Sequence, residues 1–177
     1  MNPCIAIAIG DPNGIGPEIA VKAALALQGQ GAQPVLVGDE HVIAHYLAQH
    51  DKDCVLLSFS QWCKGDTSTE RCLVYEPVQA LSAACFKPGE VSAAAGEATV
   101  AYVSKAVELA HSGRVKAVIG CPHSETAVHQ AGIAFSGYPG LIARLTGTPA
   151  DKVFLMLVAG GLRIAHVTLH ESVQSAL

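Results

Sequence analysis

Short apolar runs alternate with longer stretches of helical periodicity along most of this chain. Residues 4–9 form a continuous apolar run that ends at Gly10, as is typical of a strand buried on both faces of a parallel sheet. A helix-period stretch follows at 19–27, and Pro17 suits the first turn of that helix. The same order of strand and helix recurs down the chain, which predicts an α/β fold on a largely parallel sheet.

The remaining elements follow from the same pattern. Further strands are predicted at 34–37, 54–59, 72–75 and 115–120, and further helices at 41–50, 92–112, 124–130 and after Pro139. The polar stretch 64–71 predicts an exposed loop. In the longest helix one apolar face is expected to contain Val100, Val103, Val107 and Ala110, with Gly113 capping its end.

Two apolar strands near the end of the sequence are separated by a glycine pair. They cover 153–158 and 162–169, and Gly160 and Gly161 between them can adopt the positive φ of a tight turn. This predicts an antiparallel hairpin inside an otherwise alternating chain, so the sheet is expected to be mixed.

The composition narrows the class of protein. Of the 177 residues 50% are hydrophobic and 15% charged, whereas about a quarter charged is ordinary. This surplus predicts a subunit that buries apolar surface in a homodimer or against another part of the protein.

We expect no membrane span and no signal peptide in this sequence. A net charge of −4 without a basic stripe argues against nucleic acid. Six cysteines without a C-x-x-C pair indicate free thiols in the cytoplasm.

The loop after the first strand is rich in glycine, but its spacing matches neither G-x-G-x-x-G nor the phosphate-binding loop. Asp11 and Asn13 are expected to line a cleft beside the N–H groups at the start of the helix. The alternative is that Gly14 and Gly16 only allow close packing of strand and helix.

Histidines supply the candidate metal ligands. His41 and His45 have the spacing of two ligands on one helix face, although an exposed helix face is the commoner reason for such a pair. His166 and His170 lie on a predicted strand, with His170 at the end where a ligand is best placed. A buried structural role remains the alternative for both.

The segment 121–140 concentrates reactive side chains after an apolar strand. Its acid–base candidates are His123, Glu125 and His129, and Cys121 is either a nucleophile or a small buried residue. Loops in this position commonly face the substrate.

Three motifs together resemble the 4-hydroxythreonine-4-phosphate dehydrogenase family. They are Gly-Asp-Pro-Asn-Gly-Ile-Gly-Pro-Glu at 10–18, the Pro122 loop leading to Ala-Gly-Ile at 131–133, and Gly-Leu-Arg-Ile-Ala-His-Val-Thr-Leu-His at 161–170. The resemblance implies an isocitrate/isopropylmalate-dehydrogenase-like, two-lobed α/β fold with a mixed sheet. It covers the N-terminal half of a family member, so residues 1–177 are expected to be an N-terminal portion without the C-terminal half.

The resemblance also implies cofactors. Family members use NAD and a divalent ion held by three histidines, of which the first matches His170. Zinc, magnesium, cobalt and manganese are not distinguished. The other two ligands and most nicotinamide-binding residues belong to the half that this chain lacks, which leaves its own catalytic residues unassigned.

Two departures from the family pattern bear on the substrate. Where the pyridoxine-biosynthesis enzymes carry Gly-His-Thr-Glu, this chain has Gly-Tyr-Pro-Gly, which places Tyr138 and Pro139 in the expected substrate-binding loop. Where they carry Pro-x-x-Lys, it has Pro-His-Ser-Glu, with His123 and Glu125 as further substrate-binding candidates. Replacing Lys by Glu removes a cation that a phosphate would need. These replacements resemble the branch that acts in terephthalate degradation.

The resemblance therefore implies NAD- and metal-dependent oxidative decarboxylation of a small hydroxy acid, namely the terephthalate cis-dihydrodiol dicarboxylate, to protocatechuate. One alternative is a dehydrogenase of 4-hydroxythreonine 4-phosphate or a related phosphorylated four-carbon hydroxy acid. Another is a truncated, non-catalytic fragment that acts through dimerisation, because the chain lacks part of the expected site.

Overall fold

The computed structural model describes residues 2–65, 71–149 and 152–166, together with residues 168, 172 and 174. The chain divides into two compact units, residues 1–134 and residues 135–177. His170 and residues 66–70 of the expected loop lie outside the described residues.

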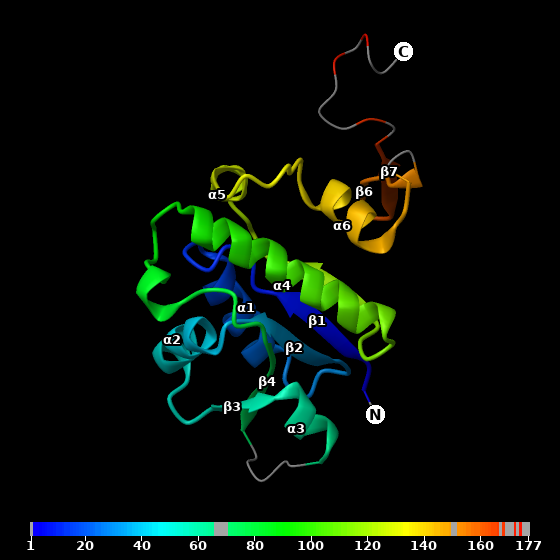
Figure 1. Cartoon of the computed structure of the whole chain (residues 1–177). Coiled ribbons are helices and arrows are strands. Elements are labelled where there is room, and N and C mark those ends of the chain that lie inside the picture. The colour runs from blue at the N-terminus through cyan, green and yellow to red at the C-terminus, as the bar shows by residue number, and fades with distance from the viewer. Residues whose placement is uncertain are drawn as a thin grey trace. The chain divides into compact units, whose positions relative to one another are not determined.

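A five-stranded parallel sheet forms the centre of the first unit (Figure 1). The strands are β1 (Cys4–Ala8), β2 (Gln33–Gly38), β3 (Val55–Ser58), β4 (Cys72–Pro77) and β5 (Ala117–Gly120), in the order β3-β4-β2-β1-β5. The interior strands β1 and β2 are lined by buried residues such as Ala6 and Leu36. The parallel α/β architecture expected from the continuous apolar runs is confirmed.

Helices cover both faces of this sheet. They are α1 (Gly16–Ala26), α2 (Glu40–His50), α3 (Phe59–Cys63), α4 (Ala93–His111) and α5 (Glu125–Gln130), with a 3-10 turn η1 at Ala83–Cys85. α1 packs with α2 and β2, whereas α4 packs with β1, β2 and β5 and lies in front of the strands in Figure 1. The connection through α1 moves from β1 toward β2, and that through α4 reaches the opposite edge. Right-handed crossovers therefore place α1 and α4 on opposite faces.

The buried face of α4 differs in part from the expected one. Val103 and Val107 are buried as predicted, but Val100 and Ala110 are only half-buried. The buried stripe consists largely of small residues, at Ala95, Gly96, Ala98, Thr99 and Ala106, with the fully buried Tyr102 among them. Small side chains let the helix approach its neighbours closely, which apolar periodicity alone does not reveal.

The predicted strand 54–59 is shorter than expected, because the chain turns into α3 at Phe59. Ser58 and Gln61 form a capping box at the start of this helix. The Ser-x-x-Gln signal was present in the sequence. The five-residue length of α3 left no periodicity from which to predict it.

The second unit contains α6 (Tyr138–Thr146) and a hairpin of β6 (Met156–Ala159) and β7 (Leu162–Ala165). The hairpin is confirmed as antiparallel, and its turn has φ of 54° at Gly160 and 84° at Gly161. Two successive positive φ values match the hairpin twist, and glycine adopts them without steric cost. In the described residues β6 and β7 pair only with each other, so the expected mixed sheet is seen as a parallel sheet and a separate antiparallel pair.

No helix in the described part of the chain is both long enough and apolar enough to cross a membrane.

Candidate active site

A pocket lies at the carboxyl ends of β1 and β5, which are adjacent and parallel. It has a volume of about 270 Å³ and is lined from three segments, within 11–15, 89–91 and 122–124. Neighbouring parallel strands whose connections leave in different directions commonly bind ligands at this edge. We therefore take this pocket as the candidate active site.

Glycines bring the loop after β1 close to the turn after β5. A Cβ at Gly10 would lie 2.1 Å from the carbonyl oxygen of Pro122, and one at Gly16 would lie 2.3 Å from that of Ile9. The backbone N–H of Asp11 donates to the Pro122 carbonyl over 3.0 Å. In this loop Gly10 and Gly16 thus serve close packing, and this packing sets the spacing between the two walls of the pocket.

Asp11 lies in the pocket wall with only 5% of its surface exposed. Its carboxylate accepts the backbone N–H of Asn13 over 2.9 Å. Burial raises the pKa of Asp11, although hydrogen bonds from Asn13 and Gly14 and the charge of His123 oppose the rise. The side chain therefore holds a proton more firmly than an ordinary aspartate does, which suits an acid–base group.

Asn13 fixes the segment that forms the third wall. Its Oδ1 accepts the N–H of Lys87 at 2.8 Å, its Nδ2 donates to the carbonyl of Glu90 at 3.2 Å, and its own carbonyl accepts from Gly89 at 2.7 Å. These bonds satisfy both ends of the side-chain amide. They hold Glu90 and Val91 in the wall of the pocket.

His123 enters the same pocket from the loop after β5. Its side chain is 19% exposed, and its Nε2 lies 3.9 Å from Oε1 of Glu125, at the start of α5. Burial lowers the pKa of His123, while the charges of Glu125 and Asp11 raise it. The imidazole is thus influenced by a carboxylate inside the pocket and by one outside.

Cys121 is buried at the end of β5, where burial raises the pKa of its thiol to about 11. A thiol of this kind stays protonated near neutral pH and is a poor nucleophile. His129 is exposed in the last turn of α5 and does not line the pocket.

Tyr138 and Pro139 are the first two residues of α6, in the second unit. Gly137 precedes them with φ of 92°, and the ring of Tyr138 meets that of Phe135 edge-on with centroids 6.3 Å apart. The structure thus gathers Asp11, Asn13 and His123 in one pocket, with Glu125 beside His123, and places Tyr138 and Pro139 in the other unit.

The described residues do not by themselves form a metal site. No group of three or more His, Cys, Asp or Glu side chains that could hold a metal is found among them. The backbone N–H of His166 donates to the carbonyl of Leu155 within the second unit, and the ring Nδ1 of His166 lies 3.3 Å from the same oxygen.

The histidine pair on α2 packs against an aromatic ring. His41 and His45 meet Phe86 edge-on at 5.8 and 5.1 Å between centroids, and Nε2 of His45 lies 2.9 Å from Nε2 of Gln49. Both histidines thus lie against Phe86, while Nε2 of His41 is buried without a hydrogen-bond partner in the described part of the chain.

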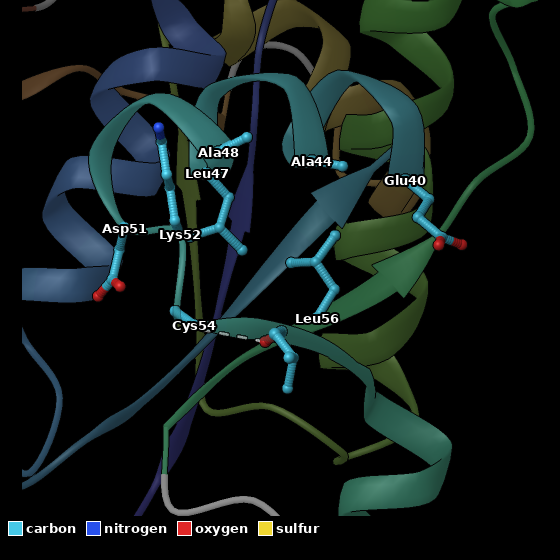
Figure 2. A pocket seen from close by; sticks show the side chains of 9 residues that line it. Glu40, Ala44, Leu47, Ala48, Asp51, Lys52, Cys54 and Leu56 are labelled. Atoms are coloured by element: carbon cyan, nitrogen blue, oxygen red, sulfur yellow. Dashed lines mark hydrogen bonds between the residues drawn. The ribbon is translucent and has the colours of Figure 1, made fainter.

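A larger recess of about 460 Å³ lies between α2 and the start of β3 (Figure 2). Figure 2 shows Leu47 and Leu56 toward its interior, with Glu40 at one end and Asp51 at the other. Asp51 forms an ion pair with Arg71 at 2.7 Å. Glu40 accepts the hydroxyl of Tyr75, and Asp51 is already paired with Arg71. Because these carboxylates lie at opposite ends of a largely aliphatic interior, the recess is a weaker candidate for an active site.

Three lining residues were not expected from the sequence, namely Ile15, Glu90 and Val91. Ile15 and Val91 are 61% and 53% exposed, so they present apolar surface at the pocket. The Lys-Pro-Gly-Glu stretch before Val91 signals a turn, but no local signal places that turn beside Asn13, more than seventy residues earlier in the sequence.

A parallel α/β unit with acid–base side chains at the carboxyl edge of its sheet is the architecture of enzymes that act on small molecules. The family model described as pyridoxal phosphate biosynthetic protein PdxA matches residues 30–177. The chain belongs to this family, and relatives named below are dehydrogenases.

Among curated relatives, the 1,2-dihydroxy-3,5-cyclohexadiene-1,4-dicarboxylate dehydrogenase of Comamonas sp is 44% identical over 98% of this chain and 50% of its own length. A 4-hydroxythreonine-4-phosphate dehydrogenase of Desulfosudis oleivorans is 30% identical over 98% of this chain and 50% of its own. The chain thus spans about half the length of the curated relatives it matches.

Solved structures agree with this assignment. A terephthalate 1,2-cis-dihydrodiol dehydrogenase from Burkholderia xenovorans LB400 is 48% identical with a TM-score of 0.76, covering 99% of this chain and 50% of that one. A 4-hydroxythreonine-4-phosphate dehydrogenase from Klebsiella pneumoniae is 31% identical with a TM-score of 0.79, covering 98% of this chain and 53% of that one. The α/β fold of this family, expected from the motifs, is confirmed, and the chain covers about half of each solved structure.

Proposed function

We propose that this chain is the N-terminal portion of an NAD-dependent, divalent-metal-dependent dehydrogenase that converts the terephthalate cis-dihydrodiol dicarboxylate to protocatechuate. The observation that carries the proposal is the 44% identity to the Comamonas enzyme over nearly the whole chain. Relatives named for phosphorylated substrates are 30% to 34% identical.

The wall of the pocket supports an unphosphorylated ring substrate. Asp11, Glu90 and His123 supply its titratable groups, and no Lys or Arg lines it in the described residues. A phosphate monoester gains most of its affinity from charge-assisted bonds to such cations. Ile15 and Val91 instead offer apolar contact to a ring.

In the proposed reaction a hydride leaves the ring carbinol for the nicotinamide, the hydroxyl proton passes to the protein, and the product is a β-keto acid. Loss of carbon dioxide then leaves an enolate, which takes up one proton to give protocatechuate, with aromatisation as the driving force. His123, Tyr138 and Pro139 belong to the proposal as substrate-binding residues, Glu125 contributes beside His123, and His170 is one ligand of the divalent ion.

The test is turnover by the protein produced with the remaining length that its relatives have. We expect NADH formation from the terephthalate cis-dihydrodiol, with protocatechuate as the carbon product and loss of activity on chelation of the metal. Turnover of 4-hydroxythreonine 4-phosphate without turnover of the diol contradicts the proposal and favours the phosphorylated alternative.

We also propose that the protein functions as a cytoplasmic homodimer. The hairpin residues Val158 and Leu162 are each 67% exposed, and apolar surface of this kind is commonly covered in an assembly. Sedimentation velocity is expected to give twice the mass of one chain, and a monomer at micromolar concentration contradicts this part of the proposal.

A further inference from the structure

Three titratable side chains lead from the pocket to the surface of the first unit. Asp11 is 5% exposed, the side chain of His123 is 19% exposed, and that of Glu125 is 59% exposed. Asp11 and His123 line the same pocket, and His123 and Glu125 are 3.9 Å apart at their nearest polar atoms. Exposure therefore increases step by step along the series.

We propose that Asp11, His123 and Glu125 form a proton relay, in which Asp11 accepts the hydroxyl proton of the substrate and His123 passes it through Glu125 to solvent. The inference rests on the proposed dehydrogenase function, because the oxidation step of that reaction releases one proton inside the pocket and the enolate left by decarboxylation takes one up.

Oxidation of the alcohol moves one hydride and one proton. The O–H bond of the carbinol breaks as its electrons form the carbonyl, the C–H hydride reduces the nicotinamide, and the proton forms an O–H bond on the Asp11 carboxylate. Asp11 then gives this proton to the imidazole of His123, which delivers it to Glu125 or to water. After loss of carbon dioxide the enolate takes up one proton, which the same groups can return from solvent, so the overall reaction releases no proton and each protein group returns to its starting state.

The surroundings bring the proton affinities of the first two groups together. Burial raises the pKa of Asp11 and lowers that of His123, so the difference between aspartate and histidine becomes smaller than in water. Transfer between groups of similar pKa is the efficient case in general acid–base catalysis.

Other charged groups nearby do not provide the same route. Glu90 lines the pocket from the third wall, Lys87 forms an ion pair with it at 3.5 Å, and Cys121 keeps its proton because its pKa is about 11. On the α4 side, Tyr102 donates its hydroxyl to the buried Asp39 and is not an outlet to solvent.

Glu125 is the residue of the relay that departs from the family pattern expected from the sequence. In the family pattern that the motifs resemble, this position is expected to hold the Lys of Pro-x-x-Lys, and a lysine there would present a positive charge to His123 and oppose its protonation. The relay is therefore expected to accompany Glu at this position and to be absent from relatives with Lys.

The first experiment follows the His123 imidazole by NMR during a pH titration, and it does not depend on turnover. Asp11→Asn and Glu125→Gln each remove a negative charge, so each is expected to lower the pKa of His123 below its value in the unmodified protein. A pKa of His123 that is unchanged in Asp11→Asn overturns the relay. His111, exposed at the end of α4, is the internal control and should titrate alike in all three proteins.

The second experiment measures kcat on the diol. Asp11→Asn is expected to lower kcat by about 100-fold or more, the usual scale of lost acid–base catalysis. His123→Gln should lower kcat with little change in KM, and added imidazole should restore part of the rate; His111→Gln should do neither. A His123→Gln enzyme with unaltered kcat and pH profile overturns the relay. If no hydroxy acid is oxidised, the proposed function fails. The NMR titration then decides by itself whether the protonation of His123 is coupled to Asp11 or independent of it.

Discussion

At the scale of single residues, the candidate site contains groups whose placement works against stability. Asp11 carries a carboxylate that burial makes harder to ionise, and His123 carries an imidazole that burial makes harder to protonate. Such strain is commonly retained where it serves chemistry. Two predictions follow from the direction of these pKa shifts.

Asp11→Asn is expected to increase the free energy of unfolding at pH 7. The pKa of Asp11 is raised in the folded state, so the unfolded chain loses its proton first, and stability falls as pH rises from the ordinary value of 3.8 through the folded pKa. Asparagine keeps an oxygen to accept the Asn13 N–H and carries no charge to desolvate. Urea unfolding at pH 7 measures the effect, and a less stable Asp11→Asn protein contradicts it.

The contribution of His123 to stability is expected to decrease as pH falls, whereas that of Asp11 decreases as pH rises. Its pKa is lowered in the folded state, so the contribution is present above the ordinary value of 6.5 and is lost as pH falls from there through the folded pKa. The melting temperature of the parent protein should therefore fall relative to that of His123→Gln when the pH is lowered from 7.5 to about 5. His111→Gln is the matched control, since this histidine is exposed.

At the scale of elements, close contacts between helices and loops determine where the site residues lie. Asp39 precedes α2 and is buried, and its carboxylate accepts the N–H groups of Ala80 and Leu81 as well as the hydroxyl of Tyr102 at 2.5 Å. This cluster joins α2, the segment after β4 and α4 at the same edge of the sheet as the pocket.

Tyr102→Phe tests this cluster while keeping the aromatic ring. It removes one of the donors to the buried Asp39 carboxylate, and a hydrogen bond to a charged group contributes about 1.5–3 kcal/mol. We expect chemical denaturation to show a loss in this range. Unchanged stability indicates that water replaces the lost donor.

Gly96→Ala tests the contact between α4 and α5. A Cβ at this position would lie 2.2 Å from the carbonyl oxygen of Ala127, a distance that forces the backbones apart. The overlap is expected to destabilise the protein by ~1–3 kcal/mol. Because α5 carries Glu125, its displacement is also expected to alter the titration of His123. Glu97→Ala, on the exposed side of the same helix, should change neither.

At the scale of the whole molecule, the chain spans about half of its relatives' length. The proposed function places the remaining metal ligands outside these 177 residues. In the protein with the remaining length, His170→Ala is expected to reduce metal-dependent activity far more than His41→Ala, because His41 packs against Phe86. Activity assays across a zinc or magnesium titration measure the difference. Equal losses in the two variants contradict the assignment of His170.

The 177 residues alone are expected to bind zinc or magnesium more weakly than a three-histidine site does. The described residues contain no cluster of three or more potential ligands. Isothermal titration calorimetry measures the affinity. Tight binding supports a complete site within the chain and contradicts the division of ligands proposed above.

Local patterns in the sequence were sufficient for much of the fold. The apolar run before Gly10 specified β1, the Gly160-Gly161 pair specified the hairpin turn, and Ser124 marked the start of α5, because each signal depends on residues adjacent in sequence. The same information was insufficient for α3, which is too short for periodicity, and for the small-residue face of α4.

The sequence by itself also determined the family, through motifs whose residues are contiguous, and the chemical identity of Asp11, His123 and Glu125. Only the tertiary structure decided that Asp11 and His123 share one pocket, and that Asn13 fastens Glu90 and Val91 to its wall. The physical reason is that these relations depend on burial and on contacts between segments far apart in sequence. A carboxylate's proton affinity follows from what surrounds it in space, and no pattern along the chain encodes that directly.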